Sequence, residues 1–303
     1  MAFAISGHEE LRLPDGLRLA VTGDPTSPVL GQFFQGYDRA FILPDEREEL
    51  DGFRACLGLN ASHRHALGRT HCEVVALLQD DAGHRLGGIN FLAVDHGAGR
   101  SVRTTLALNY LYVEEAARGR GLLRKMLAAT RQLGLVVLEL EPDQPAPVIF
   151  IEQNDPLRLT EQEYHADTRH AGLDQVDRLA IWARMGAKVV DFDYVQPALS
   201  EDLSPDDSLI YAALDYPEAA IEARVLHDHL ESFFAISVLK GRPGPARGVA
   251  ERQLTALALR RQPVALLPMG EALTALRAQP ARWGADSFRE LAKRVGQDDA
   301  SGQ

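Results

Sequence analysis

The feature that most constrains this fold is an apolar strand that leads through a glycine- and arginine-rich turn into an amphipathic helix. The strand covers residues 104–113, the turn at 118–121 reads Arg-Gly-Arg-Gly, and the helix follows over about residues 122–133. Glycines let the backbone turn tightly and let a ligand approach closely. The first amides of a helix have no partner within the helix, and the helix dipole is positive at that end. The junction is a candidate diphosphate site, although a plain strand-to-helix connection could have the same sequence.

Hydrophobic periodicity predicts further elements on both sides of this turn. We expect a strand at residues 17–21, one helix carrying the aromatic residues between 33 and 41, and another carrying the apolar residues between 50 and 57, with a helix start at Pro44 and Asp45. Further strands are expected at residues 73–79, 86–94, 148–152, 188–195 and 209–214, and a further helix at 177–185. One face of the strand at 104–113 is expected to carry Leu106, Leu108, Tyr110 and Tyr112.

The chain changes character after Pro217, where apolar residues recur at helical spacing. We therefore predict two domains, residues 1–215 and a helical C-terminal extension at residues 216–303, with a disordered tail after Gly296. The apolar stripe of the extension is expected to pack back on the sheet or to form a homodimer.

The composition argues against several classes of function. Asp and Glu outnumber Lys and Arg by 43 to 32 in 303 residues, a formal charge of −11, which argues against binding to nucleic acid or to an anionic membrane. No uninterrupted apolar stretch approaches the roughly 18 residues that a membrane span needs. The two cysteines, Cys56 and Cys72, lack metal-type spacing and suit a reducing compartment. We expect a soluble, cytoplasmic protein without a metal site.

The turn resembles the acetyl-CoA loop of the GNAT superfamily of N-acetyltransferases. Members carry (Gln or Arg)-x-x-Gly-x-(Gly or Ala) after a bulged strand, and Arg118 and Gly121 match this pattern, whereas Leu123 replaces the final small residue. The helix ending at Gly186 is similar to the family's helix ending in Tyr-x-x-x-Gly-Phe, and the element order over residues 1–214 follows the same topology. The resemblance implies an α+β (α/β) GNAT fold, with a central mixed, twisted sheet flanked by helices.

The family resemblance implies an activity and a cofactor site. A primary amine of a small molecule or peptide would attack the thioester of acetyl-CoA directly. The backbone of Leu111, Tyr112 and Val113 would pair with the pantetheine arm. The diphosphate would be held by Arg118, Gly119, Arg120, Gly121, Leu122, Leu123 and Arg124. Asn154 could bind the cofactor by a hydrogen bond or simply shape the turn that follows it.

The groups that usually move protons in this family are absent. Asn109 lies in the stretch where relatives carry an acidic base, and Trp182 replaces the usual tyrosine acid; an indole donates only an N–H. The remaining candidates are Glu152 as a base, Asn109 holding a relay water and Tyr110 as an acid. Each also has a plain structural interpretation, as do the alternative candidates Tyr112, Tyr164 and His165.

Two classes of function therefore stay open. The first is an acetyl-CoA-dependent N-acetyltransferase, with transfer of a longer acyl group as a variant. The second is a non-catalytic acyl-CoA sensor or interaction module, which the missing acid and base favour. Metal binding by His165 and His170, or by His227 and His229, would need further ligands that the sequence does not offer.

Overall fold

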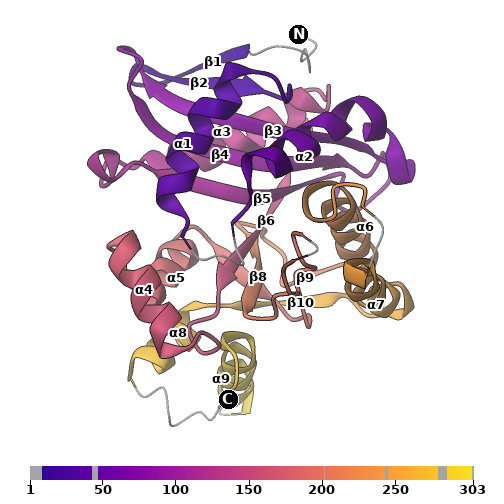
Figure 1. Cartoon of the computed structure of the whole chain (residues 1–303). Helices are drawn as coiled ribbons and strands as arrows, with labels where there is room; N and C mark the ends of the chain where they lie inside the picture. Colours follow the sequence, from indigo (N-terminus) through magenta and orange to yellow (C-terminus); the bar gives the residue numbers. More distant parts are fainter. Residues whose placement is uncertain (1–8, 43–46, 201, 243–244, 279–284, 302–303) are drawn as a thin grey trace. The chain divides into compact units, whose positions relative to one another are not determined.

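The computed structural model describes residues 9–42, 47–200, 202–242, 245–278 and 285–301. The chain divides into two compact units, which we call the first unit (Met1–Pro147 with Asp228–Gly244) and the second unit (Val148–His227 with Pro245–Gln303). Figure 1 labels their helices and strands. The expected helix start at Pro44 and Asp45 lies outside the described residues.

An antiparallel sheet forms the centre of the first unit. Its strands, which pair in sequence order, are β1 (Glu9–Leu13), β2 (Leu17–Thr22), β3 (Thr70–Asp80), β4 (Arg85–Asp95) and β5 (Thr104–Val113). The helical elements are α1 (Pro28–Ala40), α2 (Leu50–His63), α3 (Leu122–Val137), the short 3-10 turns η2 (Ala66–Gly68) and η3 (Glu115–Ala117), and the π-helix η4 (Phe234–Val238), which follows α6 (Ala223–Phe233). Local chemistry explains the start of α1, where Ser27 Oγ accepts a hydrogen bond from the amide of Val29 and Pro28 occupies the first turn.

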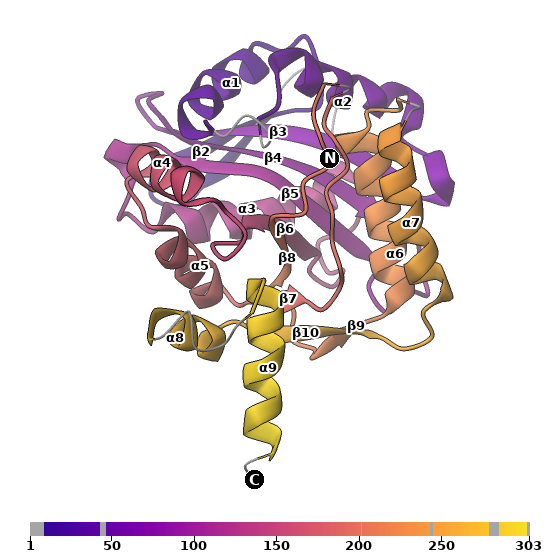
Figure 2. The ribbon, with the colours of Figure 1, turned by 60° about the horizontal axis from the view of Figure 1, so that its bottom comes forward.

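The two faces of this sheet carry different helices, as Figures 1 and 2 show. On one face, Phe33, Tyr37 and Phe53 of α1 and α2 form a buried cluster with Val75 of β3 and Tyr112 of β5. On the other face, α3 lies so close to β5 that a Cβ added at Gly134 would stand 2.7 Å from a methyl group of Leu106. Gly134 permits this close approach.

A β-bulge in β5 changes which face its side chains occupy. Leu108 pairs with Phe91 of β4, and Tyr110 pairs with Asn90, so that Asn109 has no partner on β4. A bulge of one extra residue shifts the alternation of side chains. Leu106 consequently faces α3, whereas Tyr112 faces α1. The prediction that Leu106, Leu108, Tyr110 and Tyr112 share one face is wrong, because strict alternation across the bulge was assumed.

The centre of the second unit is also formed by antiparallel strands. Its strand order is β6 (Val148–Asn154), β8 (Leu209–Leu214), β7 (Ala187–Val190), β10 (Val264–Pro268) and β9 (Ala220–Ile221). Its other helices are α4 (Glu161–Ala171), α5 (Gln175–Arg184), α7 (Pro245–Leu259), α8 (Gly270–Ala278) and α9 (Phe288–Ser301). Helix α5 packs on β7 and on α8, and α9 packs on β10.

The expected α+β class with helices flanking sheet strands is confirmed, with local differences. The polar stretch before α5 contains helix α4, which Thr160 and Glu163 begin with a reciprocal capping box. The segment from residue 216 contains strands β9 and β10 besides its helices. Helix α9 continues to Ser301, beyond the Gly296 where a disordered tail was expected.

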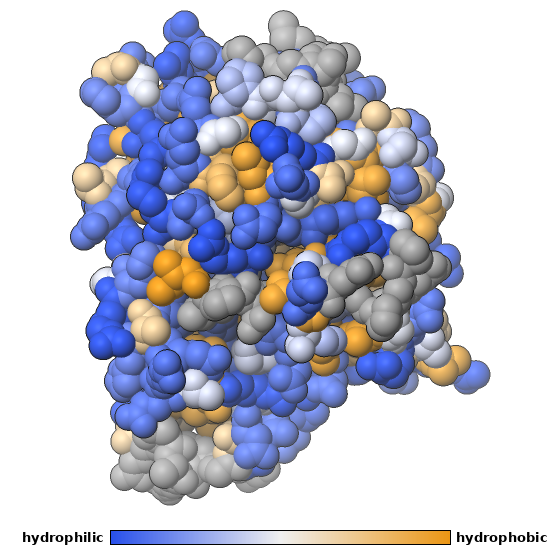
Figure 3. All heavy atoms as spheres, viewed as in Figure 1, coloured by the Kyte–Doolittle hydropathy of each residue, from blue (hydrophilic) through white to orange (hydrophobic). Residues whose placement is uncertain are grey.

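The expected apolar stripe of α6 is buried in the single chain. Leu226 and Phe233 of this stripe, and Phe234 in the adjoining η4, are at most 3% exposed. On the face shown in Figure 3, hydrophilic residues predominate and hydrophobic residues form small separate groups. Among the helices of the described part of the chain, none combines the length and the apolar character that crossing a membrane requires.

Candidate functional site

The turn after β5 has the conformation that an anion-binding loop requires. Gly119 and Gly121 have φ of +76° and +69°, in the left-handed region that favours glycine, and Gly121 is the N-cap of α3. A Cβ added at either glycine would meet nothing within 4 Å, so the backbone faces open space. Arg118 and Arg120 are exposed beside it. The backbone here is accessible to a ligand.

The N-terminus of α3 adds unpaired amides to this exposed turn. The first intrahelical bond joins the amide of Lys125 to the carbonyl of Gly121 at 3.4 Å. The amides of Leu122, Leu123 and Arg124 therefore precede the helical ladder and have no acceptor within the helix. The first turn contains no acidic residue, and Gly121 offers no side-chain cap. Helix dipole, free amides and nearby arginines together favour a bound diphosphate.

Ion pairs fix the start of the loop to the sheet. Glu114 follows β5 directly, and its Oε1 accepts hydrogen bonds from Arg85 Nε at 2.6 Å and from Arg39 Nη2 at 3.0 Å. Its amide donates to the carbonyl of Leu86 on β4. The strand end is therefore held in place while the loop beyond it stays open, a geometry that suits binding without reorganisation.

A buried polar cluster surrounds the bulge of β5. Glu73 of β3 is 1% exposed, and its Oε1 accepts hydrogen bonds from Nδ2 of Asn90 at 2.6 Å and from Nδ2 of Asn109 at 2.8 Å. Its Oε2 accepts a hydrogen bond from the Ser237 hydroxyl at 2.8 Å. Burial raises the pKa of Glu73 to about 7, although these three donors, which favour the ionised form, oppose the rise. Glu73 therefore titrates near neutral pH.

The tyrosines of β5 pack in the hydrophobic core. The hydroxyl of Tyr112 donates to the carbonyl of Phe33 at 3.0 Å, and burial raises the pKa of that phenol well above its usual range. Tyr110 packs edge-on against Tyr37, at a centroid distance of 4.7 Å, and against Phe53 at 5.5 Å. Both side chains pack as parts of the aromatic core between α1, α2 and the sheet.

Glu152 of β6 lies in the second unit and is the carboxylate that the sequence analysis names as a candidate base. Gln196 Nε2 donates to both of its oxygens, at 3.0 and 2.9 Å, and the Tyr194 hydroxyl donates to Oε1. Burial raises the pKa of Glu152 to about 7 in spite of these donors. A carboxylate with this pKa can accept a proton at neutral pH.

Other predicted residues of the second unit have simpler surroundings. Asn154 ends β6, and its Nδ2 is buried without a hydrogen-bond acceptor among the described residues. Trp182 is 8% exposed and belongs to the core. The Tyr164 hydroxyl donates to Asp174 at 2.6 Å, which ties α4 to the start of α5. Asn154 therefore keeps a free donor for a ligand, whereas Tyr164 has a structural partner.

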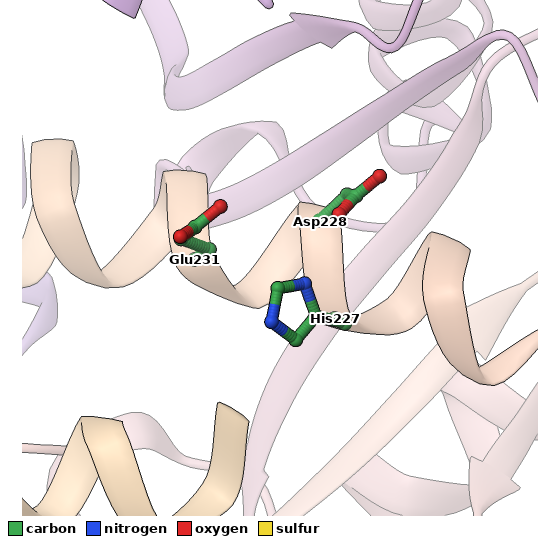
Figure 4. Close-up of side chains that lie close together, drawn as sticks. All are labelled: His227, Asp228 and Glu231. Atoms are coloured by element: carbon green, nitrogen blue, oxygen red, sulfur yellow. The ribbon is translucent and has the colours of Figure 1, made fainter. Parts of the chain in front are cut away.

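Some of the histidines lie on or near α6. His229 and His96 both contact the hydroxyl of Thr105 at 2.8 Å. Figure 4 shows His227, Asp228 and Glu231 projecting from α6, close enough together to share an ion. Both carboxylates, however, pair with Arg69, and Asp228 also pairs with Arg100 at 3.2 Å. The arginines already neutralise this acidic group.

Sequence reasoning missed several of these residues. Glu73 was treated as the first residue of an apolar strand, although a charged residue flanked by Cys72 and Val74 is the signal that a buried polar partner should exist. Its partner Ser237 and the Tyr194 and Gln196 partners of Glu152 come from segments without a motif. Tertiary folding alone brings them together.

The fold and the loop together define a class of architecture: an α+β protein with an open, glycine-rich turn after a bulged strand. No family model and no curated protein matches the sequence. Solved structures of GNAT acetyltransferases do match its fold. One is an acetyltransferase from Salmonella typhimurium that modifies the N-terminal serine of a 50S ribosomal subunit protein, at 12% identity and a TM-score of 0.35, over 68% of this chain and 97% of that one.

Two further solved structures match with similar sequence identity, coverage and TM-score. A putative GNAT-family acetyltransferase from Bordetella pertussis is 16% identical, with a TM-score of 0.33, over 68% of this chain and 98% of that one. A mutant spermidine N-acetyltransferase from Vibrio cholerae is 10% identical, with a TM-score of 0.34, over 66% and 93%. The likeness is one of fold, and the proposals below depend on this chain's own residues.

Proposed function

We propose that the protein binds acetyl-CoA at the loop of residues 118–124 and transfers the acetyl group to a primary amine. The observation that carries the proposal is the open turn: two glycines with positive φ whose Cβ positions are unobstructed, placed directly at the N-terminus of α3. Free amides at that position favour a diphosphate. Arg118, Arg120 and Arg124 would add attraction for the nucleotide end of the cofactor.

The reaction replaces a carbon–sulfur bond by a carbon–nitrogen bond, and it requires one proton to leave the nitrogen and one to reach the sulfur. The amine nitrogen bonds to the acetyl carbon, the carbon–sulfur bond breaks, the nitrogen loses a proton and the CoA thiolate gains one. Glu152 would take the proton from nitrogen through a water, because its pKa of about 7 leaves a large fraction ionised at neutral pH.

The acceptor would be a cationic amine of a small molecule or peptide in a cytoplasmic setting. The formal charge of −11 favours encounter with cations. Neither Tyr110 nor Tyr112 suits protonation of the thiolate, because the first packs in the aromatic core and the second donates to Phe33. We therefore expect the thiolate to be protonated by water.

A second candidate function is a CoA-binding sensor without catalysis, and the same enclosed tyrosines favour it. Both candidate functions require binding of acetyl-CoA, which calorimetry measures. The wild type should bind, and Gly121→Val should abolish binding, because a branched side chain strains a φ of +69° and projects into the ligand's space. Gly99→Val is the matched control, since Gly99 has a φ of +89° and open space at its Cβ but lies in another loop.

Release of free CoA thiol separates the two candidates. With acetyl-CoA and a panel of diamines, polyamines, lysine and aminoglycosides, an acetyltransferase releases one thiol per acetylated amine. Binding without any amine-dependent thiol release would support the sensor. Absence of binding in the wild type would contradict both.

A further inference from the structure

The side-chain amide of Asn109 has a fixed orientation. Its Nδ2 donates to Glu73 Oε1 at 2.8 Å and to Asn90 Oδ1 at 3.1 Å, so both of its N–H groups are used inside the cluster. This assigns the other end of the amide, Oδ1, as the acceptor that points away from Glu73. Oδ1 is buried, and none of the described residues donates a hydrogen bond to it.

The backbone places this oxygen outside the regular strand ladder. Asn109 is the extra residue of the bulge in β5 and has no partner on β4. Bulges occur next to active sites, where they re-aim a side chain. A buried acceptor needs a donor, because the hydration that it loses on burial must be replaced. The missing donor is therefore an N–H or O–H group that reaches the bulge.

The charge behind Asn109 favours a cationic donor. When Glu73 is ionised, it polarises the amide of Asn109, and the negative end of that amide is Oδ1. A chain of carboxylate, amide and ammonium groups is favourable in a site of low dielectric constant. A neutral pantetheine amide would gain less from the same arrangement.

We propose that Oδ1 of Asn109 accepts a hydrogen bond from the nitrogen of the acceptor amine, and that Glu73 is the positioning residue that holds the Asn109 amide in this orientation. This inference rests on the proposed acetyl transfer. It assigns a contact to the amine substrate at the bulge and gives a function to a carboxylate that the transfer step itself does not use.

Few other charges face Glu73. Lys240 attracts the ionised form, and its Nζ lies 2.5 Å from Oε2 of Glu48. The thiols of Cys56 and Cys72 lie nearby, and burial raises the pKa of each, so both are uncharged near neutral pH. Glu73 is thus the group of this cluster whose charge changes around neutral pH.

The first test uses Asn109→Ala and the amine of highest turnover from the panel named above. The KM for this amine should rise at least tenfold, while calorimetry should give a Kd for acetyl-CoA within twofold of the wild type. An unchanged KM overturns the proposal. A weakened Kd for acetyl-CoA with an unchanged KM would assign Oδ1 to the pantetheine arm and would equally overturn it.

The second test uses the conservative variant Glu73→Gln, which keeps the shape of the side chain. In the wild type, kcat/KM should fall below about pH 7 with contributions from Glu73 and Glu152. Glu73→Gln should lower kcat/KM and should reduce the slope of that acid limb by one proton. An unchanged slope would mean that Glu73 is only structural.

Ser237→Ala is the matched control for the pH profile. It removes the donor to Oε2 and leaves the contacts of Oε1 with Asn90 and Asn109 intact. Because that donor favours the ionised form of Glu73, its loss should move the acid limb to higher pH at an unchanged slope. If the acid limb of the kcat/KM profile does not move, the assignment of this titration to Glu73 is wrong. Absence of thiol release by the wild type with every amine would instead overturn the proposed function together with this inference.

Discussion

Oε1 of Glu73 accepts a hydrogen bond of 2.8 Å from Nδ2 of Asn109, the residue that bulges out of β5. The contact joins a buried carboxylate on β3 to the strand that leads into the glycine-rich turn. It requires β3, β4 and β5 to be in register, since Asn90 of β4 donates to the same oxygen. The bulge and the cluster therefore stabilise one another.

The titration of Glu73 should be visible in the stability of the protein. Its pKa is about 7 when folded and near 4.5 when unfolded, so between these values the folded state binds one proton more. Its contribution to stability is therefore present at low pH and is lost as the pH rises from 4.5 to 7. Relative to the wild type, Glu73→Gln should gain about 3 kcal/mol in unfolding free energy between pH 4.5 and 7.5.

Urea unfolding of both proteins at several pH values measures this difference. Any constant effect of the substitution cancels, because only the change with pH is compared. A difference that stays constant over this range would show that Glu73 titrates at an ordinary pKa.

The close approach of α1 to β5 should be sensitive to a single methyl group. A Cβ at Gly36 would lie 2.2 Å from the hydroxyl oxygen of Tyr112 and 2.4 Å from its ring, whereas a Cβ at Gly31 of the same helix would meet nothing. Gly36→Ala should therefore destabilise the protein by about 1–3 kcal/mol. Gly31→Ala should stabilise it by about 0.5–1 kcal/mol, because alanine is the better helix former. Thermal unfolding that ranks the two in the opposite order would contradict this packing.

Tyr112→Phe separates a structural tyrosine from a catalytic acid. Loss of the hydroxyl leaves the buried carbonyl of Phe33 without its 3.0 Å donor, which should cost about 1–2 kcal/mol in unfolding free energy. The kcat of the folded variant should equal that of the wild type. A large fall in kcat at temperatures where the variant is fully folded would make Tyr112 an acid after all.

Glu152→Gln tests the proposed base. Removal of a general base lowers turnover about 100-fold or more, and here the Kd for acetyl-CoA should stay near the wild-type value. Tyr194→Phe is the matched variant, because it retains the carboxylate and removes one of its donors. Without that hydrogen bond the pKa of Glu152 should rise, so the acid limb of kcat/KM should move to higher pH. Unchanged turnover in Glu152→Gln would exclude Glu152 from the reaction.

Local patterns were sufficient to predict much of this fold. The strand at residues 104–113 and the helix from Leu122 follow from hydrophobic periodicity and from glycines that need positive φ, and both begin where they were predicted. Strand β10 was missed because a short strand in a largely helical stretch has no periodicity of its own. Helix α4 was missed although Thr160 and Glu163 have capping-box spacing, because its apolar face is weak.

The candidate site was predictable only where it depends on backbone geometry. The loop at residues 118–121 has its own local signal, whereas the partners of Glu73 are 17, 36 and 164 residues away in the sequence. No local pattern links such distant positions. The resemblance implied a bulged strand, but the position of the bulge at Asn109 has no local signal, because it appears only when β5 is paired with β4.

The most direct measurement compares the affinity of acetyl-CoA with that of acetyl-pantetheine, which lacks the diphosphate, for the wild type and for Gly121→Val. If amides at the start of α3 bind the diphosphate, the wild type should bind acetyl-CoA much more tightly than acetyl-pantetheine, and Gly121→Val should lose most of that difference. Equal affinities of the wild type for the two ligands would contradict the assignment of this turn as a diphosphate site.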